Sequence, residues 1–415
     1  MAEALARFRH IRPAEVAHCR SAADVASAIA RARTEGLAVA VRGGGHCFGG
    51  TSSTDGLLID LAGLDGIRLE GDLAVVGGGA TLGRIYDELE THGRTLNAGC
   101  GTTVGIGGLV LGGGLGILGR VYGTLSDRLR AAEVVLASGE IVRADEELLW
   151  ALRGAGQARF AVVTELAFAT VEPPSSTAFE LLWAPEALPA VLHAWQRWAP
   201  EAPDAMAASL VVTAGERLQV KVFGAMAGSE AETSRTLVTL CDAAGAPPRA
   251  AVHHPGSFRE VKRFLSGPAE EGRQDEPMWC KSEYVRNGLP DTAAAALVAH
   301  LHERPDGIEA ELDFSPWAGA YARTPATASA FAHRDARFLL KHAVTVPAGA
   351  HPARARDWLA ASYAITHPHG TGGAYPNFPD TDLDFWDPAY HLTNRERLIA
   401  LKRRLDPGGV FGPTP

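Results

Sequence analysis

The stretch that decides the fold is Val41-Arg42-Gly43-Gly44-Gly45-His46-Cys47-Phe48-Gly49-Gly50. An apolar run at residues 37–41 precedes the glycines and predicts a strand, so the glycines form a loop at its carboxyl end. Glycine allows the backbone to approach a ligand closely. A histidine fixed among glycines has no packing role in such a loop. The pattern therefore indicates a histidine that lies against a bound and tethered cofactor.

A second glycine-rich region covers residues 97–123, where glycines alternate with small and aliphatic residues. Two glycine loops in one domain can enclose a pyrophosphate by donating backbone N–H groups, which favours a dinucleotide cofactor. The string Gly114-Leu-Gly116-Ile-Leu-Gly119 fits the G-x-G-x-x-G pattern. We interpret it as a chance match, because no strand precedes it in the βαβ spacing that a Rossmann fold requires.

The composition limits the partners. The chain has 415 residues, 46% of them hydrophobic, and a formal net charge of −9, so it has no basic field for a nucleic acid. No apolar stretch is long enough for a membrane span and the N-terminus lacks a signal-peptide pattern, which predicts a cytoplasmic protein without a membrane partner. The five cysteines are scattered without C-x-x-C spacing, so reduced thiols are expected.

The order of predicted elements indicates an α+β fold. A helix begins near Ser21, with Asp24 as its capping partner, and the strand at 37–41 follows. Short strands are predicted at 57–61, 67–69, 73–76, 131–137, 141–144 and 160–169, with a helix at 82–92 and a turn-rich boundary at 171–177. Beyond it, helices at 189–198, 230–244, 291–302 and 353–364 alternate with strands at 207–213, 218–226, 307–314 and 337–346, which predicts an antiparallel sheet covered by helices.

Several motifs in one order resemble a known family, the FAD-linked oxidases of the vanillyl-alcohol oxidase superfamily and their berberine-bridge-enzyme-like branch. The first is R-G-G-G-H-x-x-x-G at residues 42–50, and the second is T-V-G-I-G-G-x-x-L-G-G-G-x-G at residues 103–116. The segments 120–123, 149–156 and 160–164 look like further family motifs. Near the C-terminus, Y-x-N, N-x-x-R-L and D-P-x-x-V-F are matched at residues 375–377, 394–398 and 406–411.

The resemblance implies a split FAD-binding domain of the PCMH type, formed by residues 1–174 and 371–415, around a substrate-binding domain at 175–370. It implies that His46 is bonded to the 8α-methyl group of FAD, a bond expected to raise the flavin potential. It also implies cofactor contacts from Asn377 and from a set of loop and strand residues: Arg42, Gly43, Gly44, Gly45, Gly49, Thr102, Thr103, Gly105, Gly107, Gly108, Gly112, Gly113 and Val163.

The chain departs from the family at a second tether. Many relatives bond flavin C6 to a cysteine in G-x-C-P-T-V-G, but aligned on Thr103-Val104-Gly105 that place holds Gly101. Cys100 stands one residue earlier. It either reaches C6 through a shift of the backbone or is an unattached thiol, and both alternatives stay open. For Cys47, beside the tethering histidine, we expect the role of a small packed residue.

The family's general base is the tyrosine of Y-x-N, which is Tyr375 here. A phenol has a pKa near 10, so it accepts a proton at neutral pH only where neighbours stabilise the phenolate. Lys281, Arg334 and Lys341 are candidates for that role. Asn377 is expected to bond either the polar edge of the flavin or an inner loop.

The implied function is that of an oxidase. The substrate, a sugar or a secondary metabolite, loses a proton from an alcohol to Tyr375 and a hydride to flavin N5, and dioxygen is reduced to hydrogen peroxide. Amine oxidation or oxidative ring closure on the same flavin is the alternative, and a non-catalytic flavin- or metal-binding protein is a remote one.

Other chemistry is less well supported by the sequence. The histidines at 253–254, 367–369 and 391 lack ligands at metal spacing, so no metal site is predicted. The aspartates at 380–384 are expected to cap turns. The aromatic residues of the second domain, Trp279, Tyr284, Trp317 and Tyr321, are predicted either to line a substrate pocket or to pack in the core.

Overall fold

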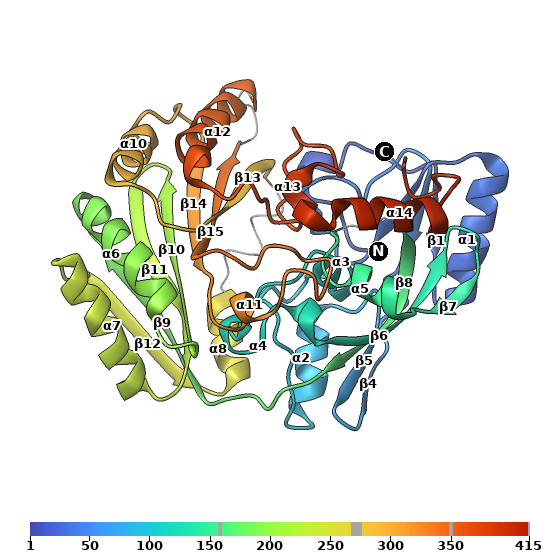
Figure 1. Cartoon of the computed structure of the whole chain (residues 1–415), viewed down its shortest axis with the longest axis horizontal. Helices are drawn as coiled ribbons and strands as arrows, with labels where there is room; N and C mark the ends of the chain where they lie inside the picture. The colour runs from blue at the N-terminus through green and yellow to red at the C-terminus, as the bar shows by residue number, and fades with distance from the viewer. Residues whose placement is uncertain (157–159, 267–275, 348–351, 414–415) are drawn as a thin grey trace.

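The computed structural model describes residues 1–156, 160–266, 276–347 and 352–413, and it shows three β-sheets with their helices (Figure 1). The first sheet is parallel, in the order β1-β3-β2, from β1 (Glu15–His18), β2 (Val39–Arg42) and β3 (Leu57–Asp60). Helix α1 (Ala22–Glu35) packs on it through apolar residues such as Val25 and Ile29. The predicted start of this helix is confirmed, because Ser21 and Asp24 form a capping box.

A five-stranded antiparallel sheet lies beside the first, in the order β4-β5-β8-β6-β7. Its strands are β4 (Ile67–Glu70), β5 (Leu73–Gly77), β6 (Leu129–Leu136), β7 (Ile141–Arg143) and β8 (Ala161–Ala169). The core on this sheet includes residues of α2 (Leu82–Glu90), α3 (Ile106–Leu111), α5 (Glu146–Leu152) and, from the far end of the chain, α14 (Arg395–Leu405). The C-terminal segment thus returns to the N-terminal part of the molecule.

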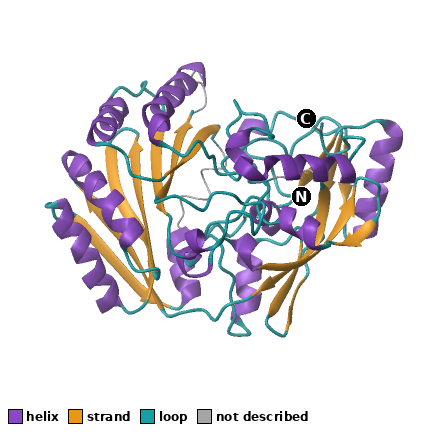
Figure 2. Cartoon of the chain, viewed as in Figure 1, coloured by secondary structure: helices purple, strands orange, loops and turns teal. Residues whose placement is uncertain are grey.

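The third sheet is antiparallel and has seven strands in the order β12-β9-β11-β10-β14-β15-β13. Helices α6 (Leu188–Glu201), α7 (Glu230–Ala244), α10 (Asp291–His302) and α12 (Pro352–Thr366) cover its outer face (Figure 2). Trp183 and Trp195 are fully buried between sheet and helices. The strands are β9 (Ser176–Trp183), β10 (Met206–Ala214), β11 (Leu218–Ala227), β12 (Ala250–Gly256), β13 (Met278–Val285), β14 (Glu309–Pro316) and β15 (Phe338–Thr345).

Short elements fill the space between the two halves: α4 (Gly119–Tyr122), α8 (Phe258–Ser266), α11 (Ala320–Arg323) and α13 (Pro388–His391). The outer face of the seven-stranded sheet meets its helices, so its other face is turned toward the glycine-rich loops (Figure 1). The α+β fold with a helix-covered antiparallel sheet is confirmed. The predicted domain limits at 174 and 371 remain predictions.

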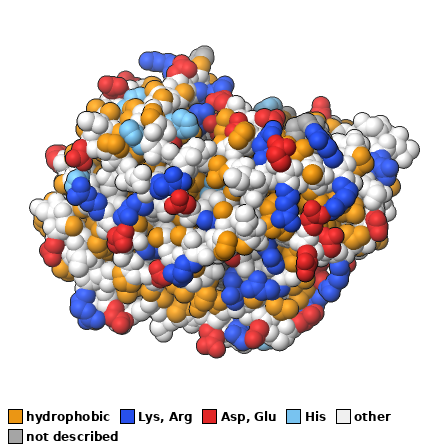
Figure 3. All heavy atoms as spheres, in the orientation of Figure 1, with side chains coloured by type: hydrophobic (Ala, Val, Ile, Leu, Met, Phe, Trp, Pro, Cys, Tyr) orange, Lys and Arg blue, Asp and Glu red, His pale blue; other side chains and the backbone are white. Residues whose placement is uncertain are grey.

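Charged side chains of both signs are interspersed over the face seen in Figure 3. Such a mixed surface matches the modest net charge of −9. No helix in the described part of the chain combines the length and the apolar character that crossing a membrane requires.

Candidate flavin site

The two glycine loops meet at one cavity of about 620 Å³. The loop that leaves β2 and the loop before α3 touch through their backbones: a methyl group added at Gly44 would collide with the nitrogen of Gly105, and one added at Gly105 would collide with that of Gly44. The glycines are therefore needed for the close approach of the loops as well as for the space they leave. A cavity of this size lies within the range of cofactor sites.

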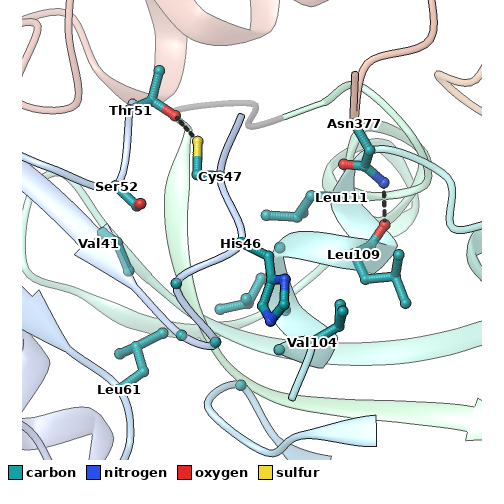
Figure 4. A pocket seen from close by; sticks show the side chains of 18 of the residues that line it. Val41, His46, Cys47, Thr51, Ser52, Leu61, Val104, Leu109, Leu111 and Asn377 are labelled. Carbon is teal, nitrogen blue, oxygen red and sulfur yellow. Dashed lines mark hydrogen bonds between the residues drawn. The ribbon is translucent and has the colours of Figure 1, made fainter. Parts of the chain in front are cut away.

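His46 projects into this cavity (Figure 4). Its Nε2 lies 2.8 Å from Thr103 Oγ1, so the second glycine loop orients the imidazole of the first. Burial lowers the pKa of His46. The ring is thus kept neutral near pH 7, which is the form in which a histidine nitrogen can act as a nucleophile or a ligand.

The cavity has unfilled space at Gly108, a residue of helix α3. Gly108 lines the cavity, and a methyl group added there would meet no atom within 4 Å. Gly107, by contrast, is pressed against the carbonyl oxygen of Gly78 and the side chain of Val163. The space at Gly108 is what a planar ring or a pyrophosphate group needs, so the donor-rich, glycine-lined cavity fits a dinucleotide.

Most of the predicted cofactor residues and the predicted base Tyr375 line this cavity: Gly43, Gly44, Gly45, His46, Cys100, Gly105, Gly107, Gly108, Val163, Tyr375 and Asn377. The other predicted residues do not belong to its lining. The guanidinium of Arg42 donates to Ser52 O at 3.0 Å and Ser53 Oγ at 3.1 Å and so closes the first loop on itself. Gly49, Gly112 and Gly113 provide close contacts with Pro379, Asn377 and Phe331. Thr103 orients His46, and the carbonyl of Thr102 accepts from Gly83 N–H.

Some cavity residues were not predicted. They lie just after the glycine loop, on the neighbouring strands and at the C-terminal end of the chain, and include Val39, Val41, Thr51, Ser52, Ser53, Leu61, Val162, Phe411 and Gly412. Phe411 belongs to the C-terminal motif D-P-x-x-V-F, so that motif was the available signal. Cys47 is half-buried and its Sγ lies 3.2 Å from Thr51 Oγ1 (Figure 4).

Tyr375 connects the seven-stranded sheet to the cavity. Its backbone N–H donates to Ser282 Oγ of β13 at 3.0 Å. Its hydroxyl oxygen accepts from Gly114 N–H at 3.1 Å and from Asn377 Nδ2 at 3.1 Å. Asn377 Nδ2 also donates to Leu109 O of α3 at 2.9 Å. Asn377 also lines the cavity, so a contact with the polar edge of the flavin stays a prediction beside the observed bond to Leu109 O.

The cationic partners expected for Tyr375 have other roles. Lys281 binds Asp380 at 2.7 Å and Asp382 at 2.8 Å, Arg334 binds Asp127, and Lys341 binds Glu311 at 2.9 Å. That prediction was wrong, because carboxylates distant in sequence take these cations. Burial raises the pKa of Tyr375 to about 12, and the donors Asn377 and Gly114 partly oppose the rise. The phenol is therefore neutral at physiological pH.

The other aromatic and acidic residues singled out in the sequence have structural roles. Tyr284, Trp317 and Tyr321 are buried in one aromatic cluster with Phe331 and Tyr375, while Trp279 is half-buried under Arg7. Asp380 and Asp384 accept backbone N–H groups two residues ahead, at Asp382 and Trp386, as turn caps do. No group of three metal-ligating side chains occurs among the residues that the structure describes.

Comparisons with known proteins agree with this site. Residues 13–145 match the family described as FAD binding domain, and residues 374–414 match the family described as berberine and berberine like. The FAD-linked oxidoreductase YvdP of Bacillus subtilis (strain 168) is 30% identical over 402 residues, which cover 94% of this chain and 88% of that protein. The chain belongs to the berberine-bridge-enzyme-like family of FAD-linked oxidoreductases.

Carbohydrate oxidases are among the similar members of this family. Glucooligosaccharide oxidase of Sarocladium strictum is 29% identical, over 96% of this chain and 86% of that protein. A crystal structure of the Acremonium strictum glucooligosaccharide oxidase superimposes with a TM-score of 0.88 at 27% identity, over 99% of this chain and 92% of that one. A further structure of that enzyme, 26% identical, is described as containing 6-S-cysteinyl, 8α-N1-histidyl FAD. This chain is thus an FAD-dependent oxidoreductase.

The open place at Gly108 gives a direct test of the cavity. Gly108→Val adds a side chain whose Cβ meets no protein atom within 4 Å, so the thermal stability of the flavin-free fraction is expected to change little while FAD content falls strongly. The control is Gly66→Ala, because Gly66 also has nothing within 4 Å but lies outside the cavity lining. Flavin absorbance per chain measures the effect. Full FAD content in Gly108→Val would place the cofactor elsewhere.

Proposed function

We propose that the enzyme oxidises an alcohol group of a small molecule, a sugar or a secondary metabolite, to a carbonyl and transfers the electrons to dioxygen, which is reduced to hydrogen peroxide. The observation that carries the proposal is Tyr375, which lines the cavity and whose hydroxyl oxygen accepts two hydrogen bonds. The likeness to glucooligosaccharide oxidase supports the alcohol as the group oxidised.

In this proposal His46 holds the cofactor covalently. Its Nε2 is engaged by Thr103, so we assign the bond to Nδ1, in agreement with the N1-histidyl attachment described for glucooligosaccharide oxidase. The lowered pKa keeps the imidazole neutral for this role. Arg42 supports the bond by holding the loop between Gly43 and Ser53 closed.

FAD, when bound, supplies the acceptor of two electrons. Tyr375 supplies the base: its oxygen takes the proton of the substrate hydroxyl as the hydride leaves the adjacent carbon. Gly114 N–H and the Asn377 amide stabilise the phenolate, and the bond from Asn377 to Leu109 O fixes that amide. The bond from Tyr375 N–H to Ser282 fixes the tyrosine between the sheet and the cavity.

The pH dependence follows from the raised pKa of Tyr375. The fraction of phenolate increases about tenfold per pH unit below the pKa, so the rate of anaerobic flavin reduction is expected to rise from pH 7 to pH 9.5. Because burial favours the neutral phenol, Tyr375 lowers the stability of the fold only above its ordinary pKa of 10, and the assay stays below that pH. Stopped-flow reduction at saturating substrate measures the rate. A rate that falls over this range would exclude the phenolate as base.

The substrate class is tested by detecting peroxide across a panel of sugars, other alcohols and amines. Peroxide from alcohols, with the carbonyl identified as product, is the expected result. Turnover confined to amines, or a ring-closed product, would replace alcohol oxidation by the alternative reaction on the same flavin. Flavin reduction without peroxide would show that dioxygen is not the electron acceptor.

A further inference from the structure

A buried lysine from the substrate side of the molecule lies on the backbone that leads to Cys100. Lys262 belongs to α8 and is 1% exposed. Its Nζ donates to Ala98 O at 2.6 Å and to Gly99 O at 3.2 Å. The hydroxyl of Tyr86 donates to the same Gly99 oxygen at 2.6 Å. The two residues before Cys100 are therefore fixed from two elements, α8 and α2.

The surroundings of this ammonium group are mostly aromatic. Nζ lies 3.8 Å from the ring centroid of Tyr86 and 4.9 Å from that of Phe258. In such a site the charge is poorly screened and acts strongly on nearby groups. Burial lowers the pKa of Lys262 to about 7, the neighbouring Arg259 adds to the fall, and Cys100 opposes it. The coupling is mutual, so the ammonium that an anionic Cys100 stabilises also stabilises the Cys100 thiolate.

Cys100 also lines the flavin cavity, together with its neighbours Gly99 and Gly101. A cysteine that lies within the field of a buried cation and at the wall of a cavity has the environment of a reactive thiol, since the thiolate is the nucleophile. The other buried cation of α8, Arg259, points to a different partner: its guanidinium binds Asp87 of α2 at 2.6 Å.

We propose that Lys262 is the positioning residue for Cys100: it fixes the preceding backbone and holds the thiol in its ionised, reactive form at the wall of the flavin cavity. The inference deepens the proposed function and rests on it, because it assigns to the displaced Cys100 the second bond to flavin. The charge increases the fraction of Cys100 in the thiolate form, which is the form that attacks.

The covalent step balances with dioxygen as oxidant. A bond from Cys100 Sγ to flavin C6 releases one proton from the thiol and one from C6, and two electrons remain to be removed. Dioxygen accepts both electrons and both protons and forms hydrogen peroxide. No other reactant is required.

Two substitutions separate the charge of Lys262 from its hydrogen bonds. Lys262→Met removes both, and Lys262→Gln keeps donors for Ala98 O and Gly99 O without the charge. Arg259→Met is the matched control, because it removes a buried cation of the same helix that does not bind residues 98–99. Purified holoenzymes are digested, and mass spectrometry determines the flavin on the peptides of Cys100 and of His46. Iodoacetamide labelling of any unbonded Cys100 is followed against pH.

The expected result is flavin on Cys100 in the wild type and in Arg259→Met, with a loss of at least about tenfold in both Lys262 variants while His46 remains modified. An unbonded Cys100 in the wild type would overturn the second bond, and the charge of Lys262 is then tested by labelling at pH 7, which is expected to be about tenfold faster than in either Lys262 variant. Equal Cys100 modification, or equal labelling profiles, in wild type and Lys262→Gln would overturn the role of the charge. A chain without flavin on His46 would contradict the proposed function. That failure is distinguishable from failure of the present inference, because the labelling of Cys100 tests the role of Lys262 without flavin.

Discussion

Replacing His46 by alanine is expected to remove the covalent bond to the 8α-methyl group of the flavin. The imidazole lies in the cavity, is kept neutral by burial, and is oriented by Thr103, so its loss removes the nucleophile and leaves the rest of the cavity intact. After acid precipitation the wild-type pellet is expected to be yellow, with about one flavin per chain, and the His46→Ala pellet is expected to keep only the flavin that Cys100 holds. Without the histidine bond, the reduction potential of any flavin that remains is expected to be lower.

Whether Cys100 also bonds the flavin determines which variant loses all of its acid-stable flavin. If the second bond forms, His46→Ala alone retains some acid-stable flavin through Cys100, and His46→Ala with Cys100→Ala retains none. The control is His302→Ala, an exposed histidine on α10, distant in sequence from both loops. A double variant that keeps its yellow pellet would show that another residue holds the flavin.

Replacing Tyr375 by phenylalanine is expected to slow anaerobic flavin reduction by about 10²- to 10⁴-fold, the usual contribution of a general base. The flavin itself remains attached, because His46 and the glycine loops are unchanged. The loss leaves Gly114 N–H and the Asn377 amide without the phenol oxygen, so a decrease in stability of about 1–3 kcal/mol is expected as well. Stopped-flow spectroscopy gives the rate and thermal unfolding gives the stability.

Tyr321→Phe separates the two effects. Tyr321 is a buried tyrosine of the same aromatic cluster, and its hydroxyl lies 3.4 Å from Gly116 O. This variant also loses a buried hydroxyl but no base, so its reduction rate is expected to stay within about threefold of the wild type. Equal reduction rates in Tyr375→Phe and the wild type would remove Tyr375 as the base.

Local signals predicted the parts of the fold that depend on neighbouring residues. Helix α1 begins at Ser21 because its capping box is contained in four residues, and α7 and α10 have the predicted limits. Strand β12 was not predicted, because its exposed pattern is that of an edge strand, which is set by its partner β9. Helix α3 was not predicted either, because its sequence, IGGLVL, contains two glycines, which have a low helix propensity.

The site was predictable where it depends on one loop and not where it depends on pairing between distant segments. His46 and the glycines at 43–45 are adjacent in sequence, and the structure brings them to the cavity. The hydrogen-bond partners of Tyr375 come from three segments of the chain. The cations that were predicted to lie beside it form ion pairs with Asp127, Asp380 and Glu311 instead. Lys262 stands 162 positions from Cys100 in the sequence, so only the fold reveals its place.

The most direct test of the central claim is mass spectrometry of the peptide that contains His46, taken from protein that has been acid-precipitated and digested. The account predicts that this peptide contains FAD, joined at the imidazole with the loss of two hydrogens. An unmodified His46 peptide, from a preparation in which each chain had bound FAD, would contradict it.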